Sequence, residues 1–173
     1  MPAAIDIETA TRVSGSICAI GAAVTDGGQS LSKRWLVKPA ENTYESMNCS
    51  IHGIWPEDTQ AAPTFAEVWP EVIRFLAGAR YVVAHNAASA ERRHLGAALV
   101  AARLRPPTWQ LACTLKASRE LLPRRDTHTL VSLAELYGIE LRHHDPESDA
   151  MACAVLATKL GLASRLSAYA IAW

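Results

Sequence analysis

The sequence predicts an α/β fold in which a mixed sheet carries helices on both faces. The first third of the chain contains three short apolar segments, two of them joined by turn residues, which is the pattern of an antiparallel meander. The remainder alternates helical periodicity with two further short apolar segments, as is typical of parallel strands joined by helices. The 173 residues, half of them hydrophobic, are expected to form a single domain over 1–173 with a sizeable core.

The first elements are three strands and a helix. The strands are expected at 3–8, 16–25 and 30–37, with a tight turn at 26–28 (Asp-Gly-Gly). A short irregular or helical segment follows around 48–54. Pro63-Thr64 then begins a helix that Gly78 ends. Its apolar residues recur at helical spacing, at Phe65, Val68, Trp69, Val72, Ile73 and Leu76.

Helices dominate the remaining chain, with two buried strands between them. The strands are expected at 80–84 and 109–114. Pro106-Pro107 cannot continue a helix, and Gly138 and Gly161 are typical helix ends. The helices are expected at 88–104, 115–122, 129–137 and 146–160, followed by a tail helix over about 162–173.

Charge and cysteine usage narrow the functional classes. Seventeen basic and seventeen acidic residues cancel, so contacts with nucleic acid should be short and local rather than spread along a duplex. The four cysteines match neither a zinc motif nor a small disulfide scaffold, which predicts free buried thiols. No signal sequence or membrane span is recognisable, so the expected location is cytoplasmic.

Two carboxylates interrupt the first apolar strand. Asp6 and Glu8 are two residues apart and therefore share a face of the strand, while Ile5 and Ile7 face the other side. Two like charges beside a core favour a compensating cation, and oxygen ligands suit Mg²⁺ or Mn²⁺. A strand end whose carboxylates face water is an equally good interpretation of this segment alone.

Two later segments carry further acids. Asp145 is a natural N-cap and Pro146 a natural first helical residue, so Asp149 falls in the first turn with His144 just ahead of it. A small-residue face would let this helix approach the sheet; it comprises Ala150, Cys153, Ala154 and Ala157. Glu91 follows the strand ending at 84. Taken separately, Asp149 and Glu91 are also ordinary acids at helix starts, and His144 an ordinary loop residue.

Three motifs in this order resemble those of the DEDDh, or DnaQ-like, 3′-to-5′ exonuclease family. They are "DIET" (6–9), "VAHNA" (83–87) and "HDPESD" (144–149). The segments "SIHGI" (50–54) and "HTLVSLAELYGI" (128–139) are also similar to the family, and the likeness covers about 3–161. Three motifs in order are far more specific than any one of them.

The resemblance implies a ribonuclease H-like fold and hydrolysis of terminal phosphodiesters with two divalent cations, Mg²⁺ or Mn²⁺. The implied metal ligands are Asp6, Glu8, Asp149 and Glu91, with His144 as general base. The implied substrate-binding residues are Ile7, Thr9, Ala10, His52 and Asn86. His52 is equally well interpreted as a structural histidine, and Arg124 and Arg125 as a solvated loop rather than phosphate ligands.

One position departs from the family pattern. The expected aspartate falls on Ala90, and Glu91 follows it. Allowing one extra residue places Glu91 at the acidic position and keeps Leu95 and Leu99 in the apolar phase of the helix. A glutamate there predicts weak activity or a preference for Mn²⁺, because Mg²⁺ tolerates poor octahedral geometry badly.

The expected substrate is the 3′ end of single-stranded DNA, with a nucleoside 5′-monophosphate as product and a role in proofreading, repair or turnover. Two alternatives remain: an exoribonuclease that acts on RNA ends, and a domain that binds nucleic-acid ends without cutting them. A DNA polymerase or a second copy of the chain is a possible partner. Comparing DNA with RNA oligomers would separate the two enzymatic readings.

Overall fold

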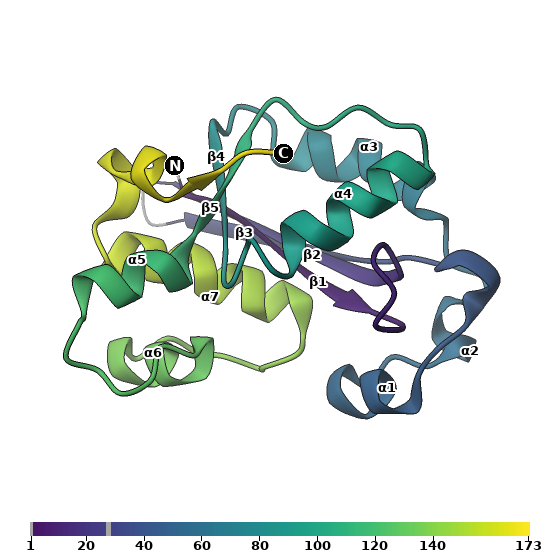
Figure 1. Cartoon of the computed structure of the whole chain (residues 1–173), viewed down its shortest axis with the longest axis horizontal. Helices are drawn as coiled ribbons and strands as arrows, with labels where there is room; N and C mark the ends of the chain where they lie inside the picture. The colour runs from purple at the N-terminus through teal and green to yellow at the C-terminus, as the bar shows by residue number, and fades with distance from the viewer. Residues whose placement is uncertain (1, 27–28) are drawn as a thin grey trace.

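A six-stranded mixed sheet forms the centre of the molecule in the computed structural model, which describes residues 2–26 and 29–173. The strand order is β3-β2-β1-β4-β5-β6 (Figure 1). β1, β2 and β3 pair antiparallel, β4 and β5 extend the sheet in parallel, and β6 returns antiparallel. The strands are β1 (Ala3–Thr9), β2 (Ile17–Asp26), β3 (Gln29–Leu36), β4 (Tyr81–Ala84), β5 (Gln110–Cys113) and β6 (Ala170–Ile171).

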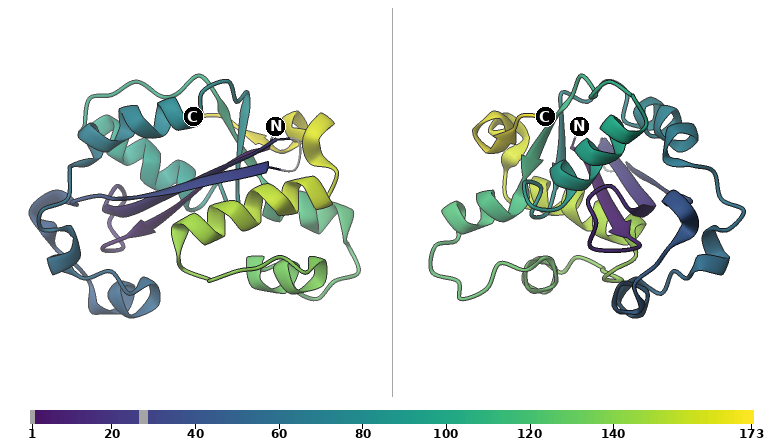
Figure 2. Two further views of the ribbon diagram at one scale, coloured as in Figure 1. Left: turned by 180° about the vertical axis from the view of Figure 1, so that it is seen from behind. Right: turned by 45° about the vertical axis from the view of Figure 1, so that its right-hand side comes forward.

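Helices cover both faces of this sheet, which confirms the predicted fold class. α3 and α4 lie on one face, and α5, α6 and α7 lie on the other, while α1 and α2 lie beyond the end of β1 (Figures 1 and 2). The helices are α1 (Ser46–His52), α2 (Pro56–Thr59), α3 (Phe65–Phe75), α4 (Glu91–Ala101), α5 (Thr114–Leu121), α6 (Leu130–Tyr137) and α7 (Pro146–Lys159). Three short 3₁₀ turns are η1 (Ala40–Asn42), η2 (Leu162–Ser164) and η3 (Leu166–Tyr169).

Alternation along β1 divides the core into two layers. Ala3 and Ile5 pack with α3 and α4, whereas Ala4 packs with α5, α6 and α7. Asp6 and Glu8 follow Ala4 in the same alternation and therefore belong to the face that α7 covers. The strand thus presents two carboxylates to one helix layer while burying its isoleucines against the other.

The helix signals in the sequence act as expected. A capping box between Thr64 and Glu67 starts α3, and the Asp145 carboxylate accepts the backbone N–H groups of Glu147 and Ser148 at the start of α7. Gly138 ends α6 with a left-handed φ of 61°.

The structure departs from the predicted elements at α4 and at the C-terminal tail. α4 spans 91–101 rather than 88–104, because residues 85–90 form turns and Asn86 has a left-handed φ of 71°. The predicted tail helix is wrong: the segment forms two 3₁₀ turns and the edge strand β6. The Trp173 indole N–H donates to the Trp109 carbonyl (2.8 Å), which anchors this strand to the core. The turn predicted at 26–28 includes Gly27 and Gly28, which lie outside the described residues.

The cysteine prediction agrees with the structure. Cys18, Cys49, Cys113 and Cys153 are all free and buried. Within the described part of the chain, no helix has both the length and the apolar character needed to cross a membrane.

Candidate active site

Three carboxylates meet where the last residues of β1 face the start of α7. Asp6 and Glu8 come from β1, and Asp149 comes from the first turn of α7. One oxygen from each lies within 4.8 Å of the other two. Asp149 is only 3% exposed, so the group is recessed rather than spread over a surface. The structure therefore brings together three of the four predicted acids into a set that could hold a cation.

A glycine in β2 allows α7 to come this close. Gly21 is the register partner of Asp6, and a Cβ atom built on Gly21 would lie 1.9 Å from the Pro146 carbonyl oxygen. The backbone of α7 thus rests directly on the backbone of β2. The predicted small-residue face continues the contact, because Ala150, Cys153, Ala154 and Ala157 are all buried.

The electrostatics of the three carboxylates favour binding of a cation. Burial, followed by the neighbouring charges of Glu91, Asp149 and Glu8, raises the pKa of Asp6 well above its usual range. Burial and the charge of Asp149 raise the pKa of Glu8 to about 8. Burial also raises the pKa of Asp149, although the His144 backbone N–H opposes that shift. A divalent cation would relieve both the desolvation and the mutual repulsion.

Glu91 is buried beside this group but lies outside its compact set of ligand atoms. It is the first residue of α4, is 2% exposed, and its charge contributes to the raised pKa of Asp6. Burial raises the pKa of Glu91 itself to about 8. Its Oε2 atom has no hydrogen-bond partner among the described residues. Leu95 and Leu99 are buried in α4, as the apolar phase of the helix predicts.

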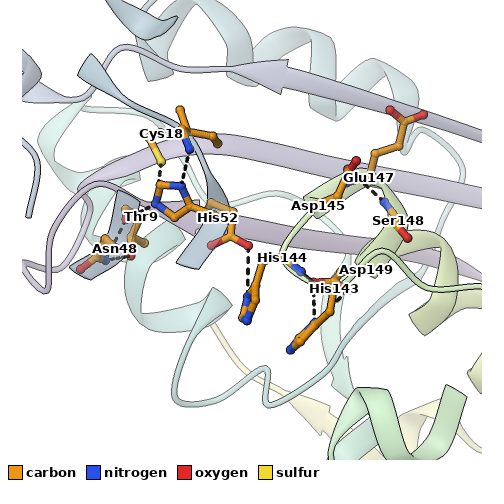
Figure 3. Close-up of polar contacts among 12 residues, drawn as sticks. Thr9, Cys18, Asn48, His52, His143, His144, Asp145, Glu147, Ser148 and Asp149 are labelled. Carbon is orange, nitrogen blue, oxygen red and sulfur yellow. Dashed lines mark hydrogen bonds and ion pairs between the residues drawn. The ribbon is translucent and has the colours of Figure 1, made fainter. Parts of the chain in front are cut away.

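His144 lies between the two carboxylate-bearing elements (Figure 3). Its Nδ1 atom is 3.8 Å from Glu8 Oε1, and its backbone N–H donates to Asp149 Oδ2 (2.9 Å). Burial lowers the pKa of His144, so its imidazole is largely neutral at pH 7. The ring is 41% exposed and is therefore reachable from solvent. A neutral, accessible imidazole beside the carboxylates can accept a proton.

The end of β1 is fixed by α1. The Thr9 carbonyl accepts hydrogen bonds from Asn48 Nδ2 (2.8 Å) and His52 Nε2 (3.2 Å) (Figure 3). His52 Nδ1 accepts the backbone N–H of Ile54 (3.0 Å), so both ring nitrogens of His52 are engaged. Of the two interpretations of His52, these contacts support the structural one.

Ile7 and Ala10 are also among the residues that the family resemblance implies for substrate binding. Ile7 is paired with Ile20 in the sheet. Ala10 is fully buried, its N–H donates to the Ser16 carbonyl (2.7 Å) and its carbonyl accepts from the Glu45 N–H (2.8 Å). Ala10 therefore shapes the end of the strand and has no backbone donor left for a ligand.

A cavity of about 520 Å³ lies next to the carboxylates of Asp6 and Asp149. Asp6, Asn86, His143 and Asp149 line it together with Arg119 of α5. The predicted site residue Asn86 therefore does reach the site. His85 also lines the cavity; its Nε2–H donates to the His128 carbonyl (2.9 Å) and its Nδ1 contacts Thr114 Oγ1 (3.0 Å).

Arg124 and Arg125 lie in the loop before α6, outside the lining of this cavity. Arg125 contacts Ser132 Oγ through Nη2 (2.8 Å) and so ties its own loop to α6. Arg124 is exposed. Both observations agree with the interpretation of this segment as a solvated loop.

Comparison with known proteins assigns the chain to a protein family. A family model described as "Exonuclease" (RNase_T) matches residues 3–157. The chain belongs to this exonuclease family. The match confirms the predicted resemblance to the DEDDh 3′-to-5′ exonucleases, and the protein is accordingly an enzyme of that type. A search of curated proteins found no significant match.

Solved structures show that the exonuclease fold extends over nearly the whole chain. Exonuclease X, solved with 5′-overhanging duplex DNA, is 22% identical, and the alignment covers 96% of each chain with a TM-score of 0.71. The nuclease domain of 3′hExo, bound to rAMP, is 18% identical over 98% of this chain and 95% of that one, with a TM-score of 0.78. E. coli Exonuclease I, solved with a dA16 oligonucleotide, is 18% identical over 98% of this chain and 43% of that one, with a TM-score of 0.75.

Sequence reasoning missed several residues that shape the site of this exonuclease. Gly21 is detectable in principle, because a glycine inside an apolar strand often marks a close backbone approach. Asn48 and Arg119 carry no such signal, since their roles depend on where α1 and α5 pack. The five-residue offset to Asp149 favours His144 over His143, yet His143 Nδ1 lies 3.2 and 3.3 Å from the two oxygens of Asp149.

Proposed function

We propose that this chain is a metal-dependent exonuclease that removes nucleoside 5′-monophosphates from the 3′ end of single-stranded DNA. The observation that carries the proposal is the convergence of Asp6, Glu8 and Asp149 beside His144. An all-oxygen ligand set with raised pKa values fits Mg²⁺ or Mn²⁺, which prefer carboxylates. The unpartnered Oε2 of buried Glu91 beside Asp6 supports the same conclusion.

Two divalent cations bound there would activate the attacking water and stabilise the negative charge on the departing 3′-oxygen. In this proposal Asp6, Glu8 and Asp149 hold them, and Glu91 adds negative charge from behind. His144 accepts the proton of the attacking water, a role worth roughly 10²- to 10⁴-fold in rate. Its lowered pKa keeps the imidazole neutral, and therefore basic, at physiological pH.

The surroundings of the carboxylates suggest how a strand would enter. The end of β1 at Thr9 borders one side of the site, where the terminal nucleotide would lie. The cavity borders the other side, with Asn86 and Arg119 facing the preceding nucleotides. Arg119 supplies a charge suited to a backbone phosphate. A site with so few phosphate contacts agrees with the balanced net charge of the chain.

DNA is the favoured substrate because two of the neighbours described above, Exonuclease X and Exonuclease I, were solved with DNA. The rAMP bound to 3′hExo supports RNA ends as the second candidate. Rates on DNA and RNA oligomers of the same sequence decide between them.

The test is digestion of a 5′-labelled single strand in Mg²⁺ or Mn²⁺, with Asp6→Asn as the control. A ladder that shortens from the 3′ end and disappears with chelator is expected. The Asp6→Asn protein should lose at least about 10²-fold in rate, because a carboxylate ligand is replaced by a neutral amide. A ladder that persists in the variant would reveal a contaminating nuclease, and binding without cutting in either metal would favour the end-binding alternative.

A further inference from the structure

His143, His144 and Asp149 form a second cluster of ligand atoms beside the carboxylates. One ring nitrogen of each imidazole and a carboxylate oxygen of Asp149 all lie within 4.8 Å of one another. Asp149 therefore belongs to two overlapping groups, one composed only of oxygens and one rich in nitrogen. The proposed exonuclease mechanism uses one histidine and leaves His143 without a role.

The backbone brings the two histidines together. Consecutive residues of an extended chain point to opposite sides, but His144 has a left-handed φ of 67°, which is unusual for a residue with a Cβ atom. As a result both rings project from the loop in the same direction (Figure 3), with centroids 3.8 Å apart. Such a conformation persists only where its surroundings hold it. Here the His144 N–H donates to Asp149, and the Arg142 N–H donates to Ser148 Oγ (2.8 Å).

We propose a second metal site, formed by His143, His144 and Asp149, that binds a transition-metal ion such as Zn²⁺. This site overlaps the all-oxygen site, because Asp149 belongs to both. Imidazole nitrogen combined with carboxylate oxygen suits Zn²⁺, Ni²⁺ or Cu²⁺ better than Mg²⁺. In a tetrahedral zinc site, neighbouring ligand atoms lie about 3.4 Å apart. His143 Nδ1 already lies 3.2 and 3.3 Å from the Asp149 oxygens.

Rotation of the two histidine side chains can complete the arrangement of ligands around one ion. His143 and His144 are 42% and 41% exposed, so their rings can turn toward a shared ion without disturbing the core. Glu8 Oε1, 3.8 Å from His144 Nδ1, is available as a fourth ligand. Binding requires His143 Nδ1 to be deprotonated, and any proton that it shares with Asp149 would leave to solvent.

Occupation of this site would inhibit the enzyme, a consequence that rests on the proposed exonuclease function. A zinc ion on His144 removes the lone pair that the general base needs, and on Asp149 it removes an oxygen from the catalytic set. Zinc is therefore expected to inhibit by competition at shared residues rather than by blocking the cavity.

Zinc binding can be measured without nucleic acid, which separates this proposal from the nuclease assignment. The experiment titrates the full chain with ZnCl₂ by calorimetry, comparing wild type with His143→Asn, Asp6→Asn and His128→Asn. We expect a zinc-binding step in the wild-type chain whose affinity falls at least about tenfold in His143→Asn. His128→Asn is the matched control, because His128 lies outside the cluster, and it should bind zinc as the wild type does.

The Asp6→Asn variant distinguishes the two sites. It should retain zinc affinity while losing the rise in Tm that Mn²⁺ gives to the wild type, and His143→Asn should retain that rise. Circular dichroism checks that each variant is folded. The proposal is overturned if wild type fails to bind zinc, if His143→Asn binds it unchanged, or if Asp6→Asn weakens it as strongly as His143→Asn does. In the nuclease assay, half-inhibition of His143→Asn should need at least about tenfold more zinc than half-inhibition of wild type.

Discussion

Asp6 and Gly21 face each other across the β1–β2 pair, and the space above Gly21 is filled by the backbone of Pro146. The residue that would hold a metal is thus paired with the residue that lets the opposing helix approach. Because Asp149 lies one turn further along that helix, the absence of a side chain at position 21 sets the separation between the carboxylates of β1 and α7.

Gly21→Ala should therefore displace Asp149 relative to Asp6 and Glu8, although residue 21 itself carries no ligand atom. The added methyl group would meet the Pro146 carbonyl at 1.9 Å, so the start of α7 must move. We expect a loss of at least about 10²-fold in nuclease rate, since a displacement of about 1 Å can cost that much, and roughly 1–3 kcal/mol of stability from overpacking. Steady-state rates and urea unfolding measure the two effects.

The matched control is Gly96→Ala in α4, where nothing lies within 4 Å of the added Cβ atom. That change should preserve activity and stabilise the protein by up to about 1 kcal/mol, because alanine favours a helix over glycine. Similar activity in both variants would show that the contact between β2 and α7 does not position the site.

Divalent cations should stabilise the folded chain. At 100 times its Kd, Mn²⁺ would add about 2.7 kcal/mol, or roughly 5–10 °C in Tm for a protein of this size. Asp6→Asn should abolish this rise and should melt above the wild type in chelator, because the variant removes a buried carboxylate surrounded by like charges. Thermal melts at pH 8 with EDTA or Mn²⁺ test both statements; an equal Mn²⁺ effect in the variant would place the ion elsewhere.

Glu91 should determine the preference between metals. Its longer side chain starts from the first residue of α4 and lies outside the compact ligand set, so Mn²⁺, which accepts looser geometry, should support faster cutting than Mg²⁺. Glu91→Asp should lower the ratio of the Mn²⁺ rate to the Mg²⁺ rate. Equally fast cutting by the wild type with both metals would contradict this expectation.

Arg119 should contribute to substrate binding rather than to chemistry. It is an exposed arginine on the cavity wall, so Arg119→Ala should raise KM several-fold with little change in kcat. Arg124→Ala is the control, because Arg124 is also an exposed arginine but is not part of that wall. Kinetics on a short single strand at two salt concentrations separate them, and equal effects of the two substitutions would indicate a general charge effect.

His85 should make stability depend on pH. Burial lowers the pKa of His85 to about 4, below the value of about 6.5 for an unfolded chain. Between these values the unfolded chain binds more protons, so this residue's contribution to stability is full above pH 6.5 and falls as the pH drops toward 4, by roughly 3 kcal/mol. Urea unfolding from pH 4 to 7 should show a shallower loss in His85→Gln than in wild type. Parallel curves would mean that His85 is not buried in its neutral form.

Local patterns in the sequence predicted most of the sheet and the order of the helices. The alternation in β1 placed Asp6 and Glu8 on one face, and the N-cap Asp145 fixed the phase of α7, so Asp149 and His144 were correctly placed near them. These predictions succeeded because strand alternation and helix capping depend on neighbours in the chain.

The errors involve contacts between distant segments. β6 has only two residues, and its pairing with Leu111 and Ala112 has no local signature, so the tail was mistaken for a helix. The start of α4 was placed too early because the left-handed turn at Asn86 depends on the packing of the site. The paired orientation of the histidines accompanies the left-handed φ of His144, which the pattern of residue types does not reveal.

The reactivity of the buried Cys153 thiol can be used to measure how often α7 separates from the sheet at this site. It lies on α7 one turn beyond Asp149, is fully buried, and burial raises its pKa, so a thiol reagent cannot react with it while the helix is docked. Labelling of Cys153, followed by mass spectrometry of its peptide, therefore counts the openings of α7 from the sheet. A metal that bridges β1 and α7 should slow that labelling. The labelling rate of Cys153 therefore measures how strongly metal binding holds α7 against the sheet.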